Sequence, residues 1–320
     1  MTTQARKSPL SEYMGDNVPE FDDNQAPWPD EDPYALYDPA APVVPVFRTL
    51  SLDDIRNLPD PEWLVGRFLQ ADSFAVLYGA PGSTKSFWAL DIALSVATGT
   101  PFHGSDVKKG QALYAAGEGL RGLKWRIESW MLAHPDVEEK DIINNLRIIP
   151  DVPHLLDKTH TAKLMNTAEG MAEQETPLRI VIIDTWARAL VGGDENSQKD
   201  AGLAVYACDS IRKSTGATTL VVHHTGTEGT RERGSTVLRG AADTSIMVAH
   251  DELSRYTTVT VKKMKDGEAG HQSVYALKQY GHSVVLDTAQ KLFGGAAPAT
   301  PVRDREYYIK KAQEAKDSPF

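Results

Sequence analysis

The stretch that most constrains the fold is residues 74–99, FAVLYGAPGSTKSFWALDIALSVATG. An apolar run of high β-propensity ends at Gly79, a glycine-containing turn follows, and Lys85 opens an apolar helical pattern that stops at Gly99. A strand that leads through such a turn into a helix aims backbone N–H groups and the helix dipole at one point, which suits a phosphate group. This stretch therefore predicts an α/β fold with further strands beside residues 74–79.

The rest of the chain repeats this alternation of short apolar runs and helical stretches. The predicted strands are 112–117, 146–150, 179–184 and 218–224, and the predicted helices are 120–133, 161–174 and 200–216. RIVIID and TTLVVHH are apolar on both faces, as central strands of a parallel sheet are. SIMVAH, YTTVTVKKM, SVYALKQY and SVVLDT follow as a run of antiparallel strands or hairpins. We predict an α/β fold in which a mostly parallel sheet has helices on both faces and an antiparallel C-terminal extension.

The charge of the chain is unevenly distributed. Residues 1–46 carry −7 of the net charge of −10 and hold eight of the nineteen prolines. An acidic, proline-rich segment buries too little apolar surface to offset its chain entropy, so we expect it to be disordered. We expect residues 47–70 to be a linker with a short helix capped by Ser51, residues 71–290 to form the main α/β domain, and residues 291–320 to be a tail or short helix.

Cysteine content and hydropathy limit the class of protein. The single Cys208 excludes a disulfide framework and a cysteine-based metal site, and is typical of a reducing compartment. No apolar run approaches the length of a membrane span, and the first residues lack the apolar core of a signal peptide. We therefore expect a cytoplasmic protein with no membrane partner.

The turn itself reads GAPGSTKS and comprises Gly79, Ala80, Pro81, Gly82, Ser83, Thr84, Lys85 and Ser86. It matches the phosphate-loop pattern G-x-x-x-x-G-K-[ST] except at Thr84, where a glycine is usual. Lys85 is predicted to reach the β- and γ-phosphates and the Ser86 hydroxyl to hold Mg²⁺, so ATP and Mg²⁺ are the expected ligands. Because the residue before the lysine leads into the helix, we expect the Thr84 side chain to be accommodated.

A phosphate loop that hydrolyses a nucleotide requires carboxylates nearby. Asp184 directly follows four apolar residues at the end of a predicted neighbouring strand, where a charge is costly unless metal or water compensates it. Glu118, in YAAGEG, follows the strand after the loop helix and is placed where a carboxylate could face the γ-phosphate. Taken alone, Glu118 is an ordinary loop glutamate; its position in the order of motifs gives it weight.

The ordered motifs GAPGSTKS, GEG, VIIDTW and LVVHHTG resemble the RecA/DnaB-type motor ATPases over roughly residues 60–285. GGDENSQKDAG and RGSTVLRGAAD are similar to phrases of the RepA-like branch of hexameric helicases and their phage and plasmid relatives. The resemblance implies that residues 71–290 form a RecA-like P-loop ATPase domain. It also implies that Asp184 holds the water shell of Mg²⁺ and that Glu118 is the catalytic base.

The resemblance also implies a γ-phosphate sensor at the end of strand 218–224. His223 and His224 are both candidates, and neighbouring residues of a strand face opposite sides of the sheet, so only one of them faces the nucleotide. Alignment of the strand end favours His224.

VKKMKDGEAG (261–270) resembles the family's strand-end motif whose two basic residues reach the γ-phosphate of a neighbouring subunit. Lys263 and Lys265 are two positions apart, which places both on one face of a strand. The resemblance implies a charge supplied in trans and hence a homo-oligomer, with a hexamer expected. A solvated hairpin tip is the alternative, and Arg233 and Arg239 are rival candidates for the trans charge.

Two loops correspond to those that line the central channel of the family and hold single-stranded DNA. Arg231 and Arg233 in the second loop, residues 224–236, and Arg239 beyond it are predicted to contact phosphates. The first loop, residues 189–200, is acidic and has no aromatic side chain on which a base could stack, which departs from the usual single-strand groove.

The sequence as a whole predicts an ATP-hydrolysing, oligomeric motor on single-stranded DNA, of the hexameric helicase type. Two alternatives remain open. Thr84 and the acidic first loop favour a nucleotide-switched DNA-binding or loading factor with low turnover, whereas Glu118 and the two lysines favour the motor. A recombinase-like filament former would need an N-terminal interaction domain, for which the sequence offers only the acidic segment and a short helix.

Overall fold

The computed structural model of the protein describes residues 49–117, 119–225 and 236–288. The chain divides into two compact units, residues 1–59 and 60–320. The described part of the first unit holds α2 (Leu52–Arg56), whose N-cap Ser51 forms a capping box with Asp54, so the predicted cap is confirmed. The segments 1–46 and 291–320, for which we stated expectations, lie outside the described residues.

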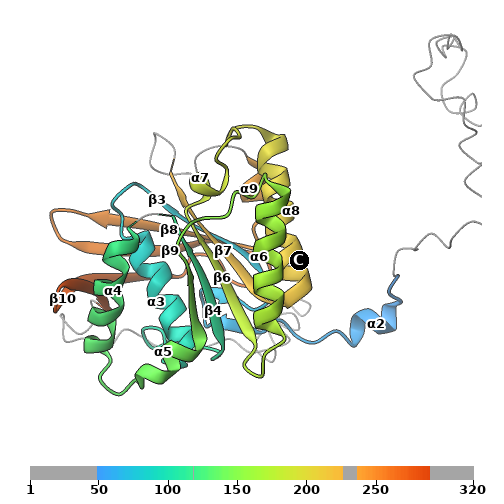
Figure 1. The fold of residues 1–320 in the computed structure, drawn as a ribbon. Coiled ribbons are helices and arrows are strands. Elements are labelled where there is room, and N and C mark those ends of the chain that lie inside the picture. The colour runs from blue at the N-terminus through green and yellow to red at the C-terminus, as the bar shows by residue number, and fades with distance from the viewer. Residues whose placement is uncertain (1–48, 118, 226–235, 289–320) are drawn as a thin grey trace, which may run out of the picture. The chain divides into compact units, whose positions relative to one another are not determined.

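The second unit is built on a nine-stranded sheet (Figure 1). In order across the sheet, its strands are β11 (Ser283–Thr288), β10 (Gln272–Tyr280), β9 (Tyr256–Met264), β8 (Thr244–Asp251), β3 (Phe74–Gly79), β7 (Thr218–His224), β6 (Leu178–Asp184), β4 (Gln111–Ala116) and β5 (Leu146–Ile149). The six strands from β8 to β5 are parallel, and β9, β10 and β11 are antiparallel. This confirms the predicted α/β class with a mostly parallel sheet and an antiparallel extension.

One strand differs from the sequence-based expectation. The SIMVAH segment was expected to begin the antiparallel run, but it forms most of β8, which pairs parallel with β3 and antiparallel with β9. An apolar strand is compatible with either direction of pairing, so the sequence could not decide between them. β8 therefore joins the parallel core to the C-terminal extension.

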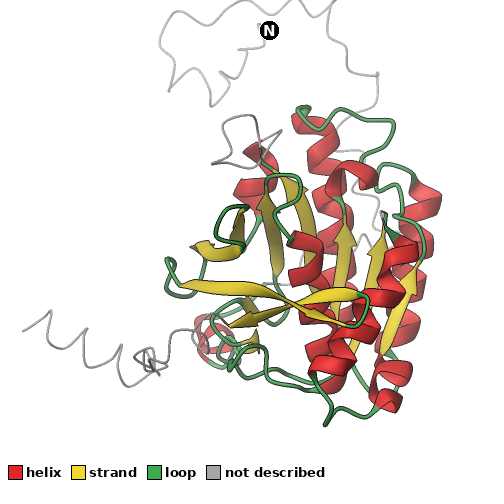
Figure 2. Cartoon of the chain, turned by 90° about the vertical axis from the view of Figure 1, so that its left-hand side faces the viewer, coloured by secondary structure: helices red, strands yellow, loops and turns green. Residues whose placement is uncertain are grey.

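Helices cover both faces of the sheet (Figures 1 and 2). One face packs against α3 (Lys85–Thr98), α4 (Leu120–Ala133) and α5 (Glu139–Asn145), and the other against α6 (Lys158–Ala172), α7 (Trp186–Ala189), α8 (Gln198–Thr215) and α9 (Thr236–Ala241). We call the two apolar layers the α3-side core, which contains Trp88 and Ile182, and the α8-side core, which contains Trp186 and Val181. The central strands contribute to both cores, as their two apolar faces predict.

The second unit also contains a short hairpin, β1 (Trp63–Val65) and β2 (Leu69–Gln70). Leu64, Phe68 and Leu69 are buried in the α3-side core, and the Phe68 ring lies edge-on to Trp88 with centroids 5.5 Å apart. We had assigned residues 60–70 to a linker, but in the structure they belong to the folded unit. Strands of two or three residues are too short to give a periodic signal in the sequence.

The ends of the long helices follow the local signals in the sequence. Gly99 and Gly216 cap α3 and α8 with φ angles of 77° and 68°, a left-handed conformation that glycine adopts without strain. Of the helices that the structure describes, none combines the length and the apolar composition needed to cross a bilayer.

Candidate active site

The carboxyl ends of four parallel strands meet at one edge of the sheet, and the phosphate loop lies at this edge. In the strand register Gly79 of β3 is paired with His224 of β7, and Asp184 of β6 lies opposite Val222 of β7 and Ala116 of β4. β7 therefore lies between the loop strand and the strand of Asp184, which we had expected to be direct neighbours. The loop, the carboxylate and the histidines that the sequence singles out come together at one edge.

Glycine is required at two positions of the loop, for a different structural reason at each. A Cβ atom on Gly79 would lie 2.1 Å from the carbonyl oxygen of Val248 in β8, so no side chain fits between the loop and that strand. Gly82 has a φ angle of 77° and open space around it, so the left-handed backbone conformation is what requires glycine there.

Thr84 leads into the helix as expected, since it is the N-cap of α3. Its backbone, with φ 67° and ψ 13°, lies in the left-handed region, which we had not expected. A β-branched residue rarely adopts this conformation, which explains why phosphate loops usually carry glycine at this position. The Thr84 Oγ1 atom lies 3.0 Å from Oγ1 of Thr257 on β9, a contact that the sequence did not indicate.

Lys85, the first residue of α3, folds back into the loop. Its side chain is buried, and its Nζ atom donates to the carbonyl oxygens of Gly79 at 3.0 Å and Ala80 at 2.7 Å. Ser86 follows in the first turn and is half-buried. The loop thus holds an ammonium group at its centre, next to the N-terminal end of a 14-residue helix, which is the charge distribution that a nucleotide phosphate needs.

Asp184 is buried, and its two carboxylate oxygens have different surroundings. Oδ2 accepts a hydrogen bond of 2.6 Å from the Tyr114 hydroxyl, whereas Oδ1 has no hydrogen-bond partner within the part of the chain that the structure describes. A buried carboxylate oxygen without a donor is costly, and a water molecule of a Mg²⁺ shell would supply that donor. The Oδ1 carboxylate oxygen of Asp184 therefore fits a water molecule bound to the Mg²⁺ that this class of loop requires.

Tyr114 is a residue that sequence reasoning missed. It lies on β4, two positions before the residue opposite Asp184, and burial together with the neighbouring carboxylate raises the pKa of its hydroxyl well above the ordinary value. The hydroxyl therefore stays protonated and keeps one oxygen of Asp184 oriented. The only available signal was a tyrosine at i−2 from the end of a buried strand, and diagonal contacts across a sheet are not visible in one sequence.

The two histidines at the end of β7 face different sides of the sheet. Leu220 and Val222 belong to the α3-side core and Val221 to the α8-side core, so alternation puts His224 on the α3 side and His223 on the α8 side. His223 is buried with its ring edge-on to Trp186, 6.4 Å between centroids, whereas His224 is half-buried. Asp184 shares the α3 side with His224, since it alternates in phase with Ile180 and Ile182.

Some of the predicted site residues lie outside the described residues. These are Glu118, Arg231 and Arg233, and their roles stay predictions. The backbone next to Glu118 is described: the Gly117 N–H donates to the Asp184 carbonyl oxygen at 2.6 Å, and a Cβ on Gly117 would come within 2.7 Å of Val152. The chain just before Glu118, the predicted base, is therefore packed closely against the end of β6.

Arg126 of α4 is a second residue that the sequence reading passed over. Its guanidinium Cζ lies 4.4 Å from the centroid of the Phe87 ring, in the first turn of α3, and its terminal nitrogen comes within 3.6 Å of a Cβ built on Gly119. Its positive charge thus lies between the helix that begins with Lys85 and the helix that follows Glu118.

Lys263 and Lys265 lie at the opposite edge of the sheet from the phosphate loop. Lys263 donates to the carbonyl oxygens of Arg239, Gly240 and Ala242 at the end of α9, which occupies its three protons. Lys265 is 65% exposed and forms an ion pair with Asp243 at 3.2 Å. β9 ends at Met264, so Lys265 lies in the following turn and not on the strand as we had expected.

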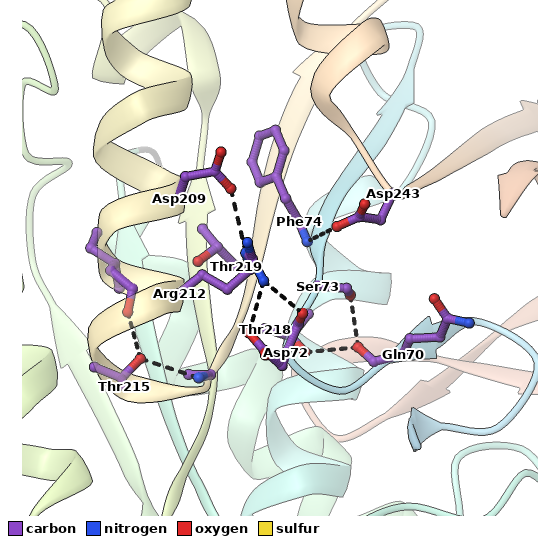
Figure 3. Close-up of polar contacts among 12 residues, drawn as sticks. Gln70, Asp72, Ser73, Phe74, Asp209, Arg212, Thr215, Thr218, Thr219 and Asp243 are labelled. Atoms are coloured by element: carbon purple, nitrogen blue, oxygen red, sulfur yellow. Dashed lines mark hydrogen bonds and ion pairs between the residues drawn. The ribbon is translucent and has the colours of Figure 1, made fainter. Parts of the chain in front are cut away.

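Asp243 shows where this edge lies relative to the loop. Its Oδ2 accepts a hydrogen bond from the Phe74 N–H, at the amino end of β3 (Figure 3). Gly79 at the other end of that strand is roughly 16 Å away, farther than a lysine side chain reaches. Neither lysine can contact a nucleotide on its own subunit's loop.

The first of the two predicted DNA loops is a closed turn in the structure. Asp200 accepts a hydrogen bond from the Asp194 N–H at 3.0 Å, and Ser197 caps α8. Trp186, just upstream, is buried in the α8-side core and offers no stacking surface. Arg239, which follows the second loop and lies on α9, is described and exposed.

The comparison with protein families gives a match. A family model described as AAA domain matches residues 43–230, a stretch that contains the phosphate loop, Asp184 and both histidines. The comparison with curated proteins finds no match.

Proposed function

Because the chain belongs to the AAA domain family of P-loop ATPases, we propose that it is an oligomeric motor that hydrolyses ATP to act on single-stranded DNA, of the hexameric helicase type. The observation that carries the proposal is the orphaned Oδ1 of Asp184 at the edge where Lys85 and His224 also lie. A polar group without a partner in a buried position, next to a phosphate loop, indicates a site built for a ligand and its metal.

In the proposed reaction each side chain has a separate task. Lys85 binds the β- and γ-phosphates. Ser86 would hold Mg²⁺ directly and Asp184 would hold it through a water molecule, and the metal would neutralise the charge that develops on the phosphate oxygens. Tyr114 keeps Asp184 oriented through its 2.6 Å hydrogen bond. His224, on the α3 side of β7, contacts the γ-phosphate, and Glu118 accepts a proton from the attacking water.

Assembly enters the proposal through Lys265. Its exposed ammonium is too far from its own loop, and its partner Asp243 is an acidic group that a phosphate could replace. We therefore assign the trans charge to Lys265 rather than to Lys263, whose protons all go to carbonyl oxygens of residues 239–242. Arg233 and Arg239 remain rival candidates.

The test of the trans charge is a mixing experiment. Lys265→Ala alone should hydrolyse ATP on the order of 10²-fold more slowly, the usual cost of one transition-state cation. Mixed with Lys85→Ala, whose Lys265 is intact, it should regain activity, because each competent site then combines one subunit's loop with the other's lysine. Failure of the mixture to regain activity would transfer the trans role to Arg233 or Arg239.

DNA binding is the part of the proposal that rests on residues 231, 233 and 239. The steady-state ATPase rate should be measured with and without single-stranded DNA, at low and moderate salt. The motor predicts a rate that DNA raises strongly and that salt lowers through loss of phosphate contacts. A slow rate that DNA leaves unchanged would contradict it.

A second function is favoured by a specific observation in the first loop. The Asp194–Asp200 turn is acidic and closed, and no aromatic side chain projects from residues 191–197. A nucleotide-switched DNA-binding or loading factor needs no such stacking surface, and it would bind DNA in an ATP-dependent manner with little turnover. ATP-dependent DNA binding combined with an unstimulated ATPase rate would favour this function over the motor.

A further inference from the structure

Thr84 is an outlier of the backbone. It is a β-branched residue in a left-handed conformation, φ 67° and ψ 13°, at the position where a glycine would carry no strain. Strain of this kind persists only where surrounding contacts compensate it, and an observed outlier is evidence for a function of those contacts. The hydroxyl of Thr84 makes such a contact.

The contact is the first step of a chain of polar groups. Oγ1 of Thr84 lies 3.0 Å from Oγ1 of Thr257, and the same Thr257 oxygen lies 3.0 Å from Nδ1 of His250. Thr257 has no exposed surface, and it is the cross-strand neighbour of His250 in the β8–β9 ladder. A buried hydroxyl that bonds to the phosphate loop on one side and to β8 on the other ties the loop to this hairpin.

The hairpin holds the loop at two points. Because β8 runs parallel to β3, its carboxyl end lies at the same edge as the loop. The Val248 carbonyl of β8 packs against Gly79 at the start of the loop, and Thr257 of β9 bonds to Thr84 at its end. The contacts thus come from the side of β3 opposite to β7, the strand of the histidines.

We propose that Thr84 is a positioning residue that fastens the phosphate loop to the β8–β9 hairpin through Thr257, and that this contact raises the affinity of the loop for ATP. The inference rests on the proposed function in that ATP is the ligand. A loop held in its binding shape loses less conformational freedom when the phosphates bind, so the free energy of binding is more favourable. The tertiary contact here takes the place of the glycine that other phosphate loops carry.

The experiment measures the dissociation constant of a fluorescent ATP analogue with Mg²⁺, using the full chain. Thr257→Val keeps the side-chain shape and removes the hydroxyl, and it should weaken binding about fivefold, the effect of one net hydrogen bond. Thr258→Val is the matched control, since Thr258 is the next residue of β9 and faces the other side of the sheet. The control should bind the analogue as the wild type does.

A double-mutant cycle separates positioning from a loss of stability. Thr84→Val should weaken binding as much as Thr257→Val, the double variant should bind no more weakly than either single variant, and Thr84→Ser should recover most of the lost affinity. The melting temperature of each variant without nucleotide shows that folded protein is compared.

The outcomes distinguish failure of this inference from failure of the proposed function. Unchanged affinity of Thr257→Val, or losses in the two single variants that add up in the double variant, would overturn the inference while leaving the proposed function intact. Absence of ATP binding by the wild-type chain would overturn both.

Discussion

The polar groups at the two ends of β3 differ in their hydrogen bonding. At the amino end, Ser73 and Thr218 both donate to the Gln70 carbonyl, Asp243 accepts from the Phe74 N–H, and Arg212 bonds to Asp72 at 2.9 Å (Figure 3). At the carboxyl end, one oxygen of Asp184 has no described partner, and the Lys85 ammonium lies against carbonyl oxygens of the loop.

The difference separates structure from function. Polar groups that hydrogen-bond to one another stabilise the fold and leave nothing for a ligand, whereas a buried polar atom without a partner costs free energy that a bound ligand can recover. The amino end is therefore a structural joint between α8, β2 and β3, and the carboxyl end is the site. Four predictions test this comparison, from the largest effect to the smallest.

Lys85→Ala should have the largest effect on ATP hydrolysis of the substitutions at the carboxyl end. ATP hydrolysis should fall on the order of 10³-fold, because the substitution removes the cation that the loop holds for the phosphates. The measurement is the steady-state ATPase rate, with Lys213→Ala, an exposed lysine in the last turn of α8, as the charge-matched control. Normal turnover by Lys85→Ala would mean that the loop is not the catalytic one.

Substituting one carboxylate at each end gives opposite results. Asp184→Asn should reduce Mg²⁺-dependent hydrolysis on the order of 10²-fold while its melting temperature stays equal or rises, because a buried charge disappears and Tyr114 keeps an acceptor. Asp243→Asn should instead lower stability by about 1 kcal/mol, since it weakens the acceptor for Phe74 and the pair with Lys265. Rate assays and thermal melts of both variants decide; equal destabilisation would remove the distinction between the two ends.

Substitutions of the two histidines compare a proposed site residue with a core residue within the single strand β7. His224→Ala should lower kcat at least tenfold with little change in melting temperature, because the side chain faces the α3 side, where we propose that the phosphates bind. His223→Ala should act mainly on stability, by about 1–3 kcal/mol, since it leaves a cavity beside Trp186. The reverse pattern would assign the sensor to His223.

Arg212→Ala should have the smallest effect. The side chain of Arg212 is 22% exposed and that of Asp72 61%, so this partly screened pair contributes at most about 1 kcal/mol of stability. The ATPase rate at saturating ATP should be unchanged, because the pair lies at the end of the sheet away from the loop. Urea unfolding together with the rate measurement checks both statements; a loss of rate would show that the amino end is more than a joint.

Local patterns were sufficient to predict most elements. β3, β7 and α4 have the bounds that the sequence predicts, because apolar strands flanked by glycine and a helical period are encoded within a few residues. The loop, Asp184 and the two histidines were also identified from short motifs. The hairpin β1–β2 and the one-turn helix α7 were missed, since elements this short leave no period to detect.

Contacts between distant residues were beyond reach. Tyr114 and Asp184 are 70 positions apart, and Thr84 and Thr257 are 173 apart. The sequence around one residue of such a pair therefore cannot predict the other residue. The same limit explains Lys263, which was expected to act on a neighbouring subunit but caps α9 from 21 to 24 positions away.

The sequence by itself determined the class of fold, and it singled out the GAPGSTKS loop and Asp184 as candidates for the site, because each depends on residue types at fixed short spacings. Only the tertiary structure decided that β7 separates the loop from Asp184, that His224 and not His223 shares a face with α3, and that Thr84 reaches β9. The physical reason is that strand order, facing and side-chain contacts are set by packing over the whole sheet, to which each local stretch contributes only one edge or one face.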